Sequence, residues 1–352
     1  MATISLCMIV KDEEPVLRRC LESVGTAADE IIIVDTGSTD RTVDIARQFT
    51  DRVFTFPWND NFADARNFAF SKAVMDYQMW LDADDVLEDA AALCRLKAQL
   101  TADVVMLPYH VAFDADGVPV MSYYRERLLR RACGFQWVGA VHEAITPTGD
   151  IIYGETAVLH RKEHVNDPER NLRIFEKRLA DGAMLAPREQ YYYARELYYH
   201  KRYAQAADMF TQFLDGGSGW EEDCIGACLQ LSSCYLALGE TTAAFTALFR
   251  SFSYDRPRAE VCCEIGRLYM IQERWEDAVF WYEMAIAAPL RTKGFSQPDY
   301  YDYVPYMQIC VCHDRLGNVR LARAYNEKAG RIKPKDANFL ANRKYFREIL
   351  KE

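Results

Sequence analysis

The sequence predicts an α/β domain built on a mostly parallel sheet, followed by an all-α domain of repeated helices. Two patterns and the chain length lead to this class. In the first half, short apolar runs alternate with amphipathic helical patterns. In the second half the strand-like runs disappear, and alanine and aromatic residues recur at helical spacing. A length of 352 residues also suits two domains better than one.

The composition narrows the classes of function. Half of the residues are hydrophobic, which is enough to bury a sizeable core, and the net charge of −10 argues against a nucleic-acid-binding surface. No apolar stretch approaches the roughly 20 residues of a membrane-spanning helix, and the N-terminus lacks a secretory signal pattern. The 11 cysteines form no CxxC pair, so neither a zinc site nor a disulfide framework is indicated. We therefore expect a cytoplasmic protein.

Three apolar runs in the first half, at residues 4–10, 30–34 and 52–56, are typical of buried parallel strands joined by crossover helices. We expect Asp12 to cap the helix after the first strand, with Pro15 in its first turn. In such sheets ligands bind outside the carboxyl ends of the strands. The sequence therefore predicts a binding site at this edge of the sheet.

Polar clusters at residues 11–14, 35–40 and 82–85 all follow predicted strands. In the third cluster, Asp82, Asp84 and Asp85 come directly after an apolar run. Carboxylates this close together repel each other unless a positive group lies between them, and hard oxygen ligands suit Mg²⁺ or Mn²⁺. The alternative is a helix N-cap with acidic residues in the first turn. The chain has no glycine-rich phosphate loop, so a bound diphosphate would need a metal and basic side chains.

Two basic features accompany these clusters. Arg66 lies near the start of a helix predicted over residues 62–73, where it faces either the site or solvent. A basic run at residues 124–131 follows a hairpin turn predicted at 114–117. This run is either a solvated edge strand or a strand that faces a diphosphate.

Taken together, four segments of the first half resemble a family 2 glycosyltransferase of GT-A fold. They occur in the order of the family and extend over about half of the chain. The segments are Lys11-Asp12-Glu13 after the opening strand, Val34-Asp35-Thr36-Gly37-Ser38-Thr39-Asp40-Arg41-Thr42, Asp64-Ala65-Arg66-Asn67 and Leu81-Asp82-Ala83-Asp84-Asp85.

The resemblance implies a UDP-sugar donor and a divalent metal, Mg²⁺ or Mn²⁺. Asp35 should hydrogen-bond the uracil, Glu13 or Glu14 should lie near the nucleoside, and Arg66 should meet the base or a phosphate. Asp82 should hold the ribose or the sugar. The full set of donor-binding residues expected from the resemblance is Val10, Glu13, Asp35, Thr36, Arg66, Asp82 and Ala83.

The resemblance also implies the metal ligands and a general base. Asp84 should bind the metal, with His160 as a further ligand at a strand end, and Asp85 should lie in a supporting position or cap a helix. Glu143 follows His142 where family members place the catalytic carboxylate, and a partly desolvated Glu can deprotonate an acceptor. His142 is the alternative base, and a purely structural pair is the alternative to both.

In the second half a repeat emerges from four alanines, each five residues after a turn position. The pattern resembles the tetratricopeptide repeat (TPR), with a plain helical bundle as the alternative. We expect an α/β GT-A domain over residues 1–165, a linker helix over 166–186 and a TPR-like domain over 187–352. The alanines are Ala206, Ala244, Ala278 and Ala322, and the turn positions are Lys201, Gly239, Glu273 and Gly317.

The resemblance implies transfer of a sugar from a UDP-sugar with inversion at the anomeric carbon. The combination with repeats is similar to bacterial peptide glycosyltransferases, including those that glycosylate cysteine in bacteriocins. This implies a peptide or protein acceptor held by the concave surface of the repeats, whereas a homodimer interface is an equal alternative use of that surface. Two other functions stay open. One is a cell-envelope glycosyltransferase, whose basic amphipathic helix is not evident in the sequence, and the other is a non-catalytic scaffold with a degenerate nucleotide-binding module.

Overall fold

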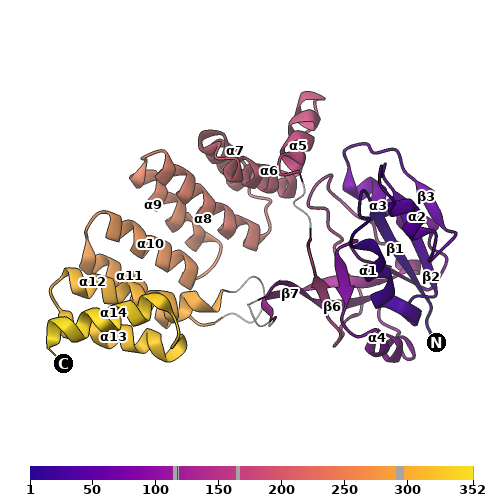
Figure 1. Cartoon of the computed structure of the whole chain (residues 1–352). Coiled ribbons are helices and arrows are strands. Elements are labelled where there is room, and N and C mark those ends of the chain that lie inside the picture. The colour runs from indigo at the N-terminus through magenta and orange to yellow at the C-terminus, as the bar shows by residue number, and fades with distance from the viewer. Residues whose placement is uncertain (114–116, 118, 164–166, 291–296, 352) are drawn as a thin grey trace. The chain divides into compact units, whose positions relative to one another are not determined.

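A computed structural model describes residues 1–113, 117, 119–163, 167–290 and 297–351 of the chain. The chain divides into two compact units, Met1–Met184 and Leu185–Glu352. The first is an α/β unit and the second is all-helical, so the predicted fold class is confirmed (Figure 1). The expected linker region contains helix α5 (Arg170–Ala180), which belongs to the first unit, whereas residues 164–166 lie outside the described residues.

The first unit is organised around one sheet with the strand order β3-β2-β1-β4-β7-β6-β9-β5, and β8 pairs with β6. Strands β3, β2, β1 and β4 are parallel, and β7 pairs antiparallel with both β4 and β6. The strands are β1 (Ile4–Val10), β2 (Glu30–Asp35), β3 (Val53–Thr55), β4 (Tyr77–Trp80), β5 (Asp85–Leu87), β6 (Val104–Phe113), β7 (Pro119–Arg130), β8 (Ile151–Tyr153) and β9 (Val158–His160).

Strand β7 corrects one expectation. The basic run at 124–131 does not form a solvated edge strand, because β7 lies between two neighbours and buries Leu128 and Leu129 completely. The antiparallel pairing of β6 with β7 agrees with the predicted hairpin, although residues 114–116 of its turn lie outside the described residues.

Helices cover both faces of the sheet, as a buried parallel sheet requires. Alternate residues of β1 point to opposite faces. Leu6 and Met8 pack with Leu17 of α1, whereas Cys7 packs in the cluster that contains Phe70 of α3. The helices of this unit are α1 (Leu17–Val24), α2 (Thr42–Ala46), α3 (Phe62–Lys72), α4 (Ala90–Lys97) and α5, with 3₁₀ turns at Gly25–Ala27 and Arg131–Cys133.

The start of α1 differs from the prediction. The helix begins at Leu17, and Asp12 does not cap it. Instead, Asp12 has a positive φ of 54°, and its Oδ1 accepts a hydrogen bond of 2.6 Å from the backbone N–H of Thr39. Asp12 therefore ties the loop after β1 to the loop after β2, which brings two of the predicted polar clusters together.

The described residues of the second unit form four consecutive helix pairs and a final helix. Each predicted repeat alanine lies in the second helix of its pair and is completely buried, and all four turn positions have positive φ. The four-copy repeat is therefore confirmed. The pairs are α6 (Pro187–Tyr199) with α7 (Tyr203–Asp215), α8 (Glu221–Ala237) with α9 (Thr241–Arg250), α10 (Ala259–Ile271) with α11 (Trp275–Ala287) and α12 (Tyr303–Arg315) with α13 (Val319–Ile332), followed by α14 (Ala337–Leu350), with 3₁₀ turns at Ser251–Ser253 and Pro298–Tyr301.

Candidate active site

One cavity of about 1140 Å³ opens at the carboxyl ends of the parallel strands in the first unit. Its volume slightly exceeds the roughly 300–1,000 Å³ that is typical of ligand pockets. Every predicted site residue except Asp35 lines it. The predicted residues that do so are Val10, Glu13, Thr36, Arg66, Asp82, Ala83, Asp84, His142, Glu143 and His160.

Asp35 is the exception. Its Oδ2 accepts a hydrogen bond of 3.1 Å from the backbone N–H of Gly37, and its Oδ1 accepts one of the same length from Ser38. The carboxylate thus shapes the loop after β2. Its neighbour Thr36, whose hydroxyl and backbone N–H both donate to the Val10 carbonyl, is the residue of this loop that lines the cavity. The uracil contact of Asp35 stays a prediction.

Arg66 connects two of the carboxylates. Its Nε donates to Glu143 Oε1 at 2.6 Å and its Nη2 donates to Asp82 Oδ1 at 2.7 Å. The guanidinium also lies 4.8 Å from the centre of the Trp137 ring, and only 9% of the side chain is exposed. Arg66 is therefore not a solvated helix residue. Burial opposes ionisation of Asp82, but the charge of Arg66 outweighs it and lowers the pKa of Asp82 to about 2.

Asp85 has a different partner. Its side chain is fully buried, and its Oδ2 forms an ion pair of 3.1 Å with Arg127, which is also fully buried. Tyr109 donates its hydroxyl to Asp85 Oδ1 at 3.0 Å, and Arg127 lies between the rings of Tyr109 and Trp80, at 4.4 Å and 3.8 Å from their centres. Asp85 starts β5 and caps no helix, which rules out the helix-cap alternative and leaves the supporting position as a prediction.

Among the described residues, Asp84 forms its ion pair with His160 and not with an arginine. Oδ1 of Asp84 lies 3.5 Å from Nδ1 of His160, which also lies 3.4 Å from Oδ1 of Asp85. The ligand atoms of these three residues all lie within 4.8 Å of one another. Burial raises the pKa of Asp84 although His160 opposes the rise, and the hydrogen bond to Asp85 raises the pKa of His160.

This donor set fits a hard divalent cation. Arginines already neutralise Asp82 and Asp85, whereas Asp84 shares its charge with His160 alone among the ion pairs of the described residues. Burial and the charges of Asp84 and Asp82 raise the pKa of Glu13, which also lines the cavity, to about 7. Burial is the largest cause of both raised pKa values, and the neighbouring carboxylates add to them, so a bound cation would favour the ionised forms.

The loop that carries His142 and Glu143 is closed by a two-way backbone pairing. Val138 and Ala144 each donate an N–H to the other at 3.0 Å. Within the loop the backbone of His142 has a positive φ of 54°. Residues other than glycine rarely adopt this conformation, and it is enriched at functional sites. A backbone hydrogen bond from Phe62 to Ala140 joins this loop to the start of α3, which presents Arg66 to Glu143.

Sequence reasoning missed several cavity residues. Arg125 of β7 lines the cavity and approaches the Trp80 ring at 4.9 Å. It belongs to the basic run at 124–131, whose charged residues concealed a central strand. Helix α5 contributes further cavity-lining residues, and no local motif marked them. These are Arg170, Asn171, Arg173, Ile174 and Lys177.

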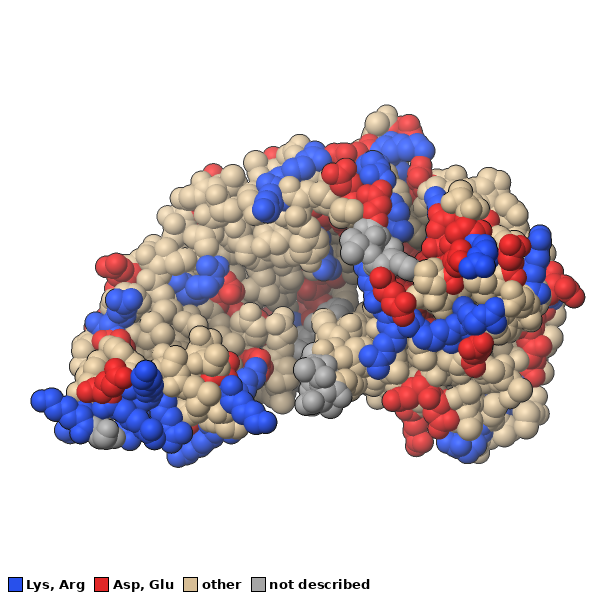
Figure 2. Space-filling view, viewed as in Figure 1, with Lys and Arg blue, Asp and Glu red and all other residues tan. Residues whose placement is uncertain are grey.

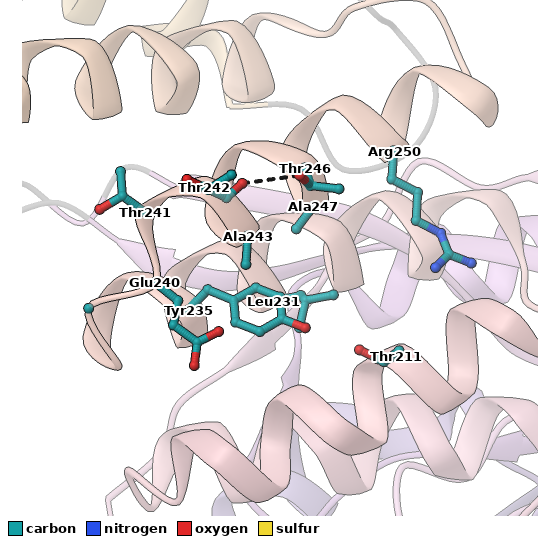
Figure 3. A pocket seen from close by; sticks show the side chains of 11 residues that line it. Thr211, Leu231, Tyr235, Glu240, Thr241, Thr242, Ala243, Thr246, Ala247 and Arg250 are labelled. Atoms are coloured by element: carbon teal, nitrogen blue, oxygen red, sulfur yellow. Dashed lines mark hydrogen bonds between the residues drawn. The ribbon is translucent and has the colours of Figure 1, made fainter.

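The second unit has a groove of its own, of about 720 Å³, between α7, α8 and α9. Leu231 and Tyr235 of α8 point into the space between α9 and Thr211 of α7, and Thr246 donates its hydroxyl to the Thr242 carbonyl at 3.1 Å (Figure 3). The groove thus combines apolar and hydroxyl-bearing side chains.

Residues 5–147 match the family described as glycosyl transferase family 2, so the first unit carries a domain of this family. The resemblance recognised in the sequence is therefore confirmed for this part of the chain.

Three relatives extend the comparison. A TPR repeat-containing protein of Synechococcus elongatus is 48% identical over 148 residues, which are 41% of this chain and 36% of the relative. The lipopolysaccharide core biosynthesis glycosyltransferase LpsC of Rhizobium meliloti is 30% identical over 181 residues, 47% of this chain and 66% of the relative. The prophage-derived glycosyltransferase SunS of Bacillus subtilis is 32% identical over 114 residues, 30% of this chain and 27% of the relative. The chain thus matches between 27% and 66% of the length of these three proteins.

A helix that crosses a bilayer must be about 20 residues long and mostly apolar. Within the described parts of the chain, none is both long and apolar enough to cross a membrane.

Proposed function

We propose that this protein is a metal-dependent glycosyltransferase that moves a sugar from a UDP-sugar to an acceptor with inversion. One observation carries the proposal: a metal-type donor set and a second, separate carboxylate line the same cavity in a family 2 domain. Inverting transfer needs a group that neutralises the departing diphosphate and a base that takes the acceptor proton. Asp84 with His160 supplies the first, and Glu143 supplies the second.

Asp84 and His160 would hold Mg²⁺ or Mn²⁺ in the proposed enzyme. When bound, the ion supplies positive charge for the diphosphate leaving group. Arg125 adds a fixed positive charge to the cavity wall. Asp85 orients His160 through its hydrogen bond, while Arg127 balances the charge of Asp85, so that the cluster does not carry three uncompensated negative charges.

Glu143 is proposed as the general base. Arg66 holds Oε1 of Glu143, and we assign Oε2 to take the proton from the acceptor. Arg66 also holds Asp82, the residue proposed for the ribose or sugar, so one side chain positions both the donor and the base. His142 is the alternative base on the same loop.

For the acceptor, we infer a peptide or protein side chain. The support is the pairing of a family 2 domain with a repeat unit whose groove offers both apolar contacts and hydroxyl groups. A saccharide of the cell envelope is the second candidate. It is favoured by one observation, the similarity to a relative named for lipopolysaccharide core biosynthesis.

The test is calorimetric titration of UDP into the purified chain with Mn²⁺, repeated in EDTA. Micromolar binding that requires the metal is expected, together with its loss in Asp84→Asn. The matched control is Asp44→Asn, because Asp44 is an exposed aspartate that does not line the cavity. Binding that persists in EDTA and in Asp84→Asn would contradict the metal role. No UDP binding under any condition would leave the non-catalytic scaffold as the better description.

A further inference from the structure

The C-terminal end of the second unit is strongly basic, although the protein as a whole is acidic. From Val319 to Lys351 the chain carries ten Lys and Arg against three Asp and Glu, a net charge of +7. Because the net charge of the whole protein is −10, the rest of the chain carries a net charge of −17. Figure 2 shows the Lys and Arg side chains gathered at this end of the repeat unit, over α13, α14 and the C-terminus.

Part of this charge is concentrated around one pocket between α13 and α14, of about 390 Å³. Four arginines and a single acidic residue, Glu327, line it. On each helix the charged residues follow one stripe, because they recur three or four positions apart. The arginines are Arg323 and Arg331 on α13 and Arg343 and Arg347 on α14.

Two of the four arginines form no ion pair within the described parts of the chain. Glu327 forms an ion pair of 3.3 Å with Arg343. Arg331 and Arg347 are exposed, and neither forms an ion pair with another described residue. Two such guanidinium groups beside one pocket repel each other in the absence of a counter-charge, and guanidinium groups match the geometry of phosphate and carboxylate oxygens.

The floor of the pocket holds the two arginine stripes at a fixed spacing. Gly330 of α13 lies against the ring of Phe339 of α14, where a Cβ atom would collide with the ring. Asn326, which is fully buried, donates its Nδ2 hydrogen to the Phe339 carbonyl at 3.2 Å. The backbone positions of the arginines are therefore set before any ligand binds, which reduces the entropy lost on binding.

We propose that the pocket between α13 and α14 is a binding site for phosphoryl groups, held by Arg323, Arg331, Arg343 and Arg347. The phosphoryl group belongs either to a soluble polyphosphate compound or to the headgroup of an anionic phospholipid, since both present the same oxygens. This site is separate from the candidate active site, because all of its residues belong to the second unit.

The test uses pyrophosphate as the soluble probe and vesicles of phosphatidylglycerol and phosphatidylcholine as the lipid probes. Calorimetry with the full chain should show saturable pyrophosphate binding that weakens as salt is added, or sedimentation should show binding to the anionic but not to the neutral vesicles. Either result supports the site and identifies the source of the phosphoryl group. Because the first unit is proposed to bind a diphosphate, the titration is done in EDTA and repeated in Asp84→Asn.

Two variants make the test specific. Arg331→Gln/Arg347→Gln should weaken binding about tenfold or more, because each lost arginine removes charge-assisted hydrogen bonds. Glu327→Gln should strengthen binding, because it removes the one negative charge of the pocket. The control is Arg47→Gln/Arg256→Gln, which makes the same charge change at two exposed arginines elsewhere. Equal binding by the control and by Arg331→Gln/Arg347→Gln, or no binding of either probe, would overturn the proposal.

Discussion

The buried ion pair of Arg127 with Asp85 gives the sharpest test of how the first unit is built. Both side chains are fully buried, and the pair is 3.1 Å long. Removing one partner from such a pair leaves an unpaired buried charge and costs about 3–5 kcal/mol, a large part of the 5–15 kcal/mol that typically stabilises a domain. Arg127→Met keeps the volume of the side chain near Trp80 and Tyr109 but removes the charge. We therefore expect the free energy of unfolding of the first unit to fall by about 3–5 kcal/mol.

The assay is calorimetric unfolding of the full chain, in which the transition of the second unit serves as an internal control. Asp85→Asn/Arg127→Met removes both charges and should recover most of the loss, because Asn can still accept the hydroxyl of Tyr109. If Arg127→Met costs less than about 1 kcal/mol, or if the double variant is no more stable than the single one, the charge-balance argument for this cluster is wrong.

Two further predictions concern the other carboxylates of the cavity. Glu143→Gln should keep UDP binding but lower the transfer rate by about 10²–10⁴-fold in a single-turnover assay, and transfer at the original rate would point to His142 as the base. For Glu13, whose pKa of about 7 lies above the ordinary 4.5, the folded state holds a proton that the unfolded state releases, so stability falls as the pH rises from about 4.5 to 7. Relative to the natural protein, Glu13→Gln should therefore become more stable over this range, by about 1–3 kcal/mol, in urea titrations at several pH values, and parallel curves would contradict the assignment. The raised pKa of His160 also stabilises the folded state, and this stabilisation is lost as the pH rises through that pKa. The effect is common to both proteins, so it cancels in the difference between them.

Features that depend on residues close together along the chain could be predicted from the sequence, whereas features that depend on contacts between distant segments could not. The parallel strands and the repeat were predictable because burial and helical spacing are periodic along the chain. The convergence of Glu13, Asp82 and Asp84 followed from a topological rule about strand ends. By contrast, Asp12 resembled a helix cap, yet it bonds to Thr39 across the gap between two loops, a contact that depends on the register of the sheet.

The buried position of Arg127 was unpredictable for a related reason. Local sequence shows only a charged run, and the neighbours that make its burial tolerable come from three other strands, β4, β5 and β6. The contribution of α5 to the cavity likewise depends on how the chain returns after β9. Periodic signals therefore located the elements, whereas charge pairs between distant segments became visible only in the folded chain.

The double hydrogen bond of Arg66 has a consequence for the order of events in the proposed reaction. One guanidinium binds Asp82, the residue proposed for the donor, and Glu143, the proposed base, through different nitrogens. A donor that hydrogen-bonds Oδ1 of Asp82 would compete with Arg66 and change how firmly Arg66 holds the base. In the proposed enzyme, occupancy of the donor site would therefore affect the base through a single side chain. This arrangement favours sequential kinetics in which the UDP-sugar binds first and the acceptor second, so that Glu143 is readied for its proton only when a sugar is present to be transferred.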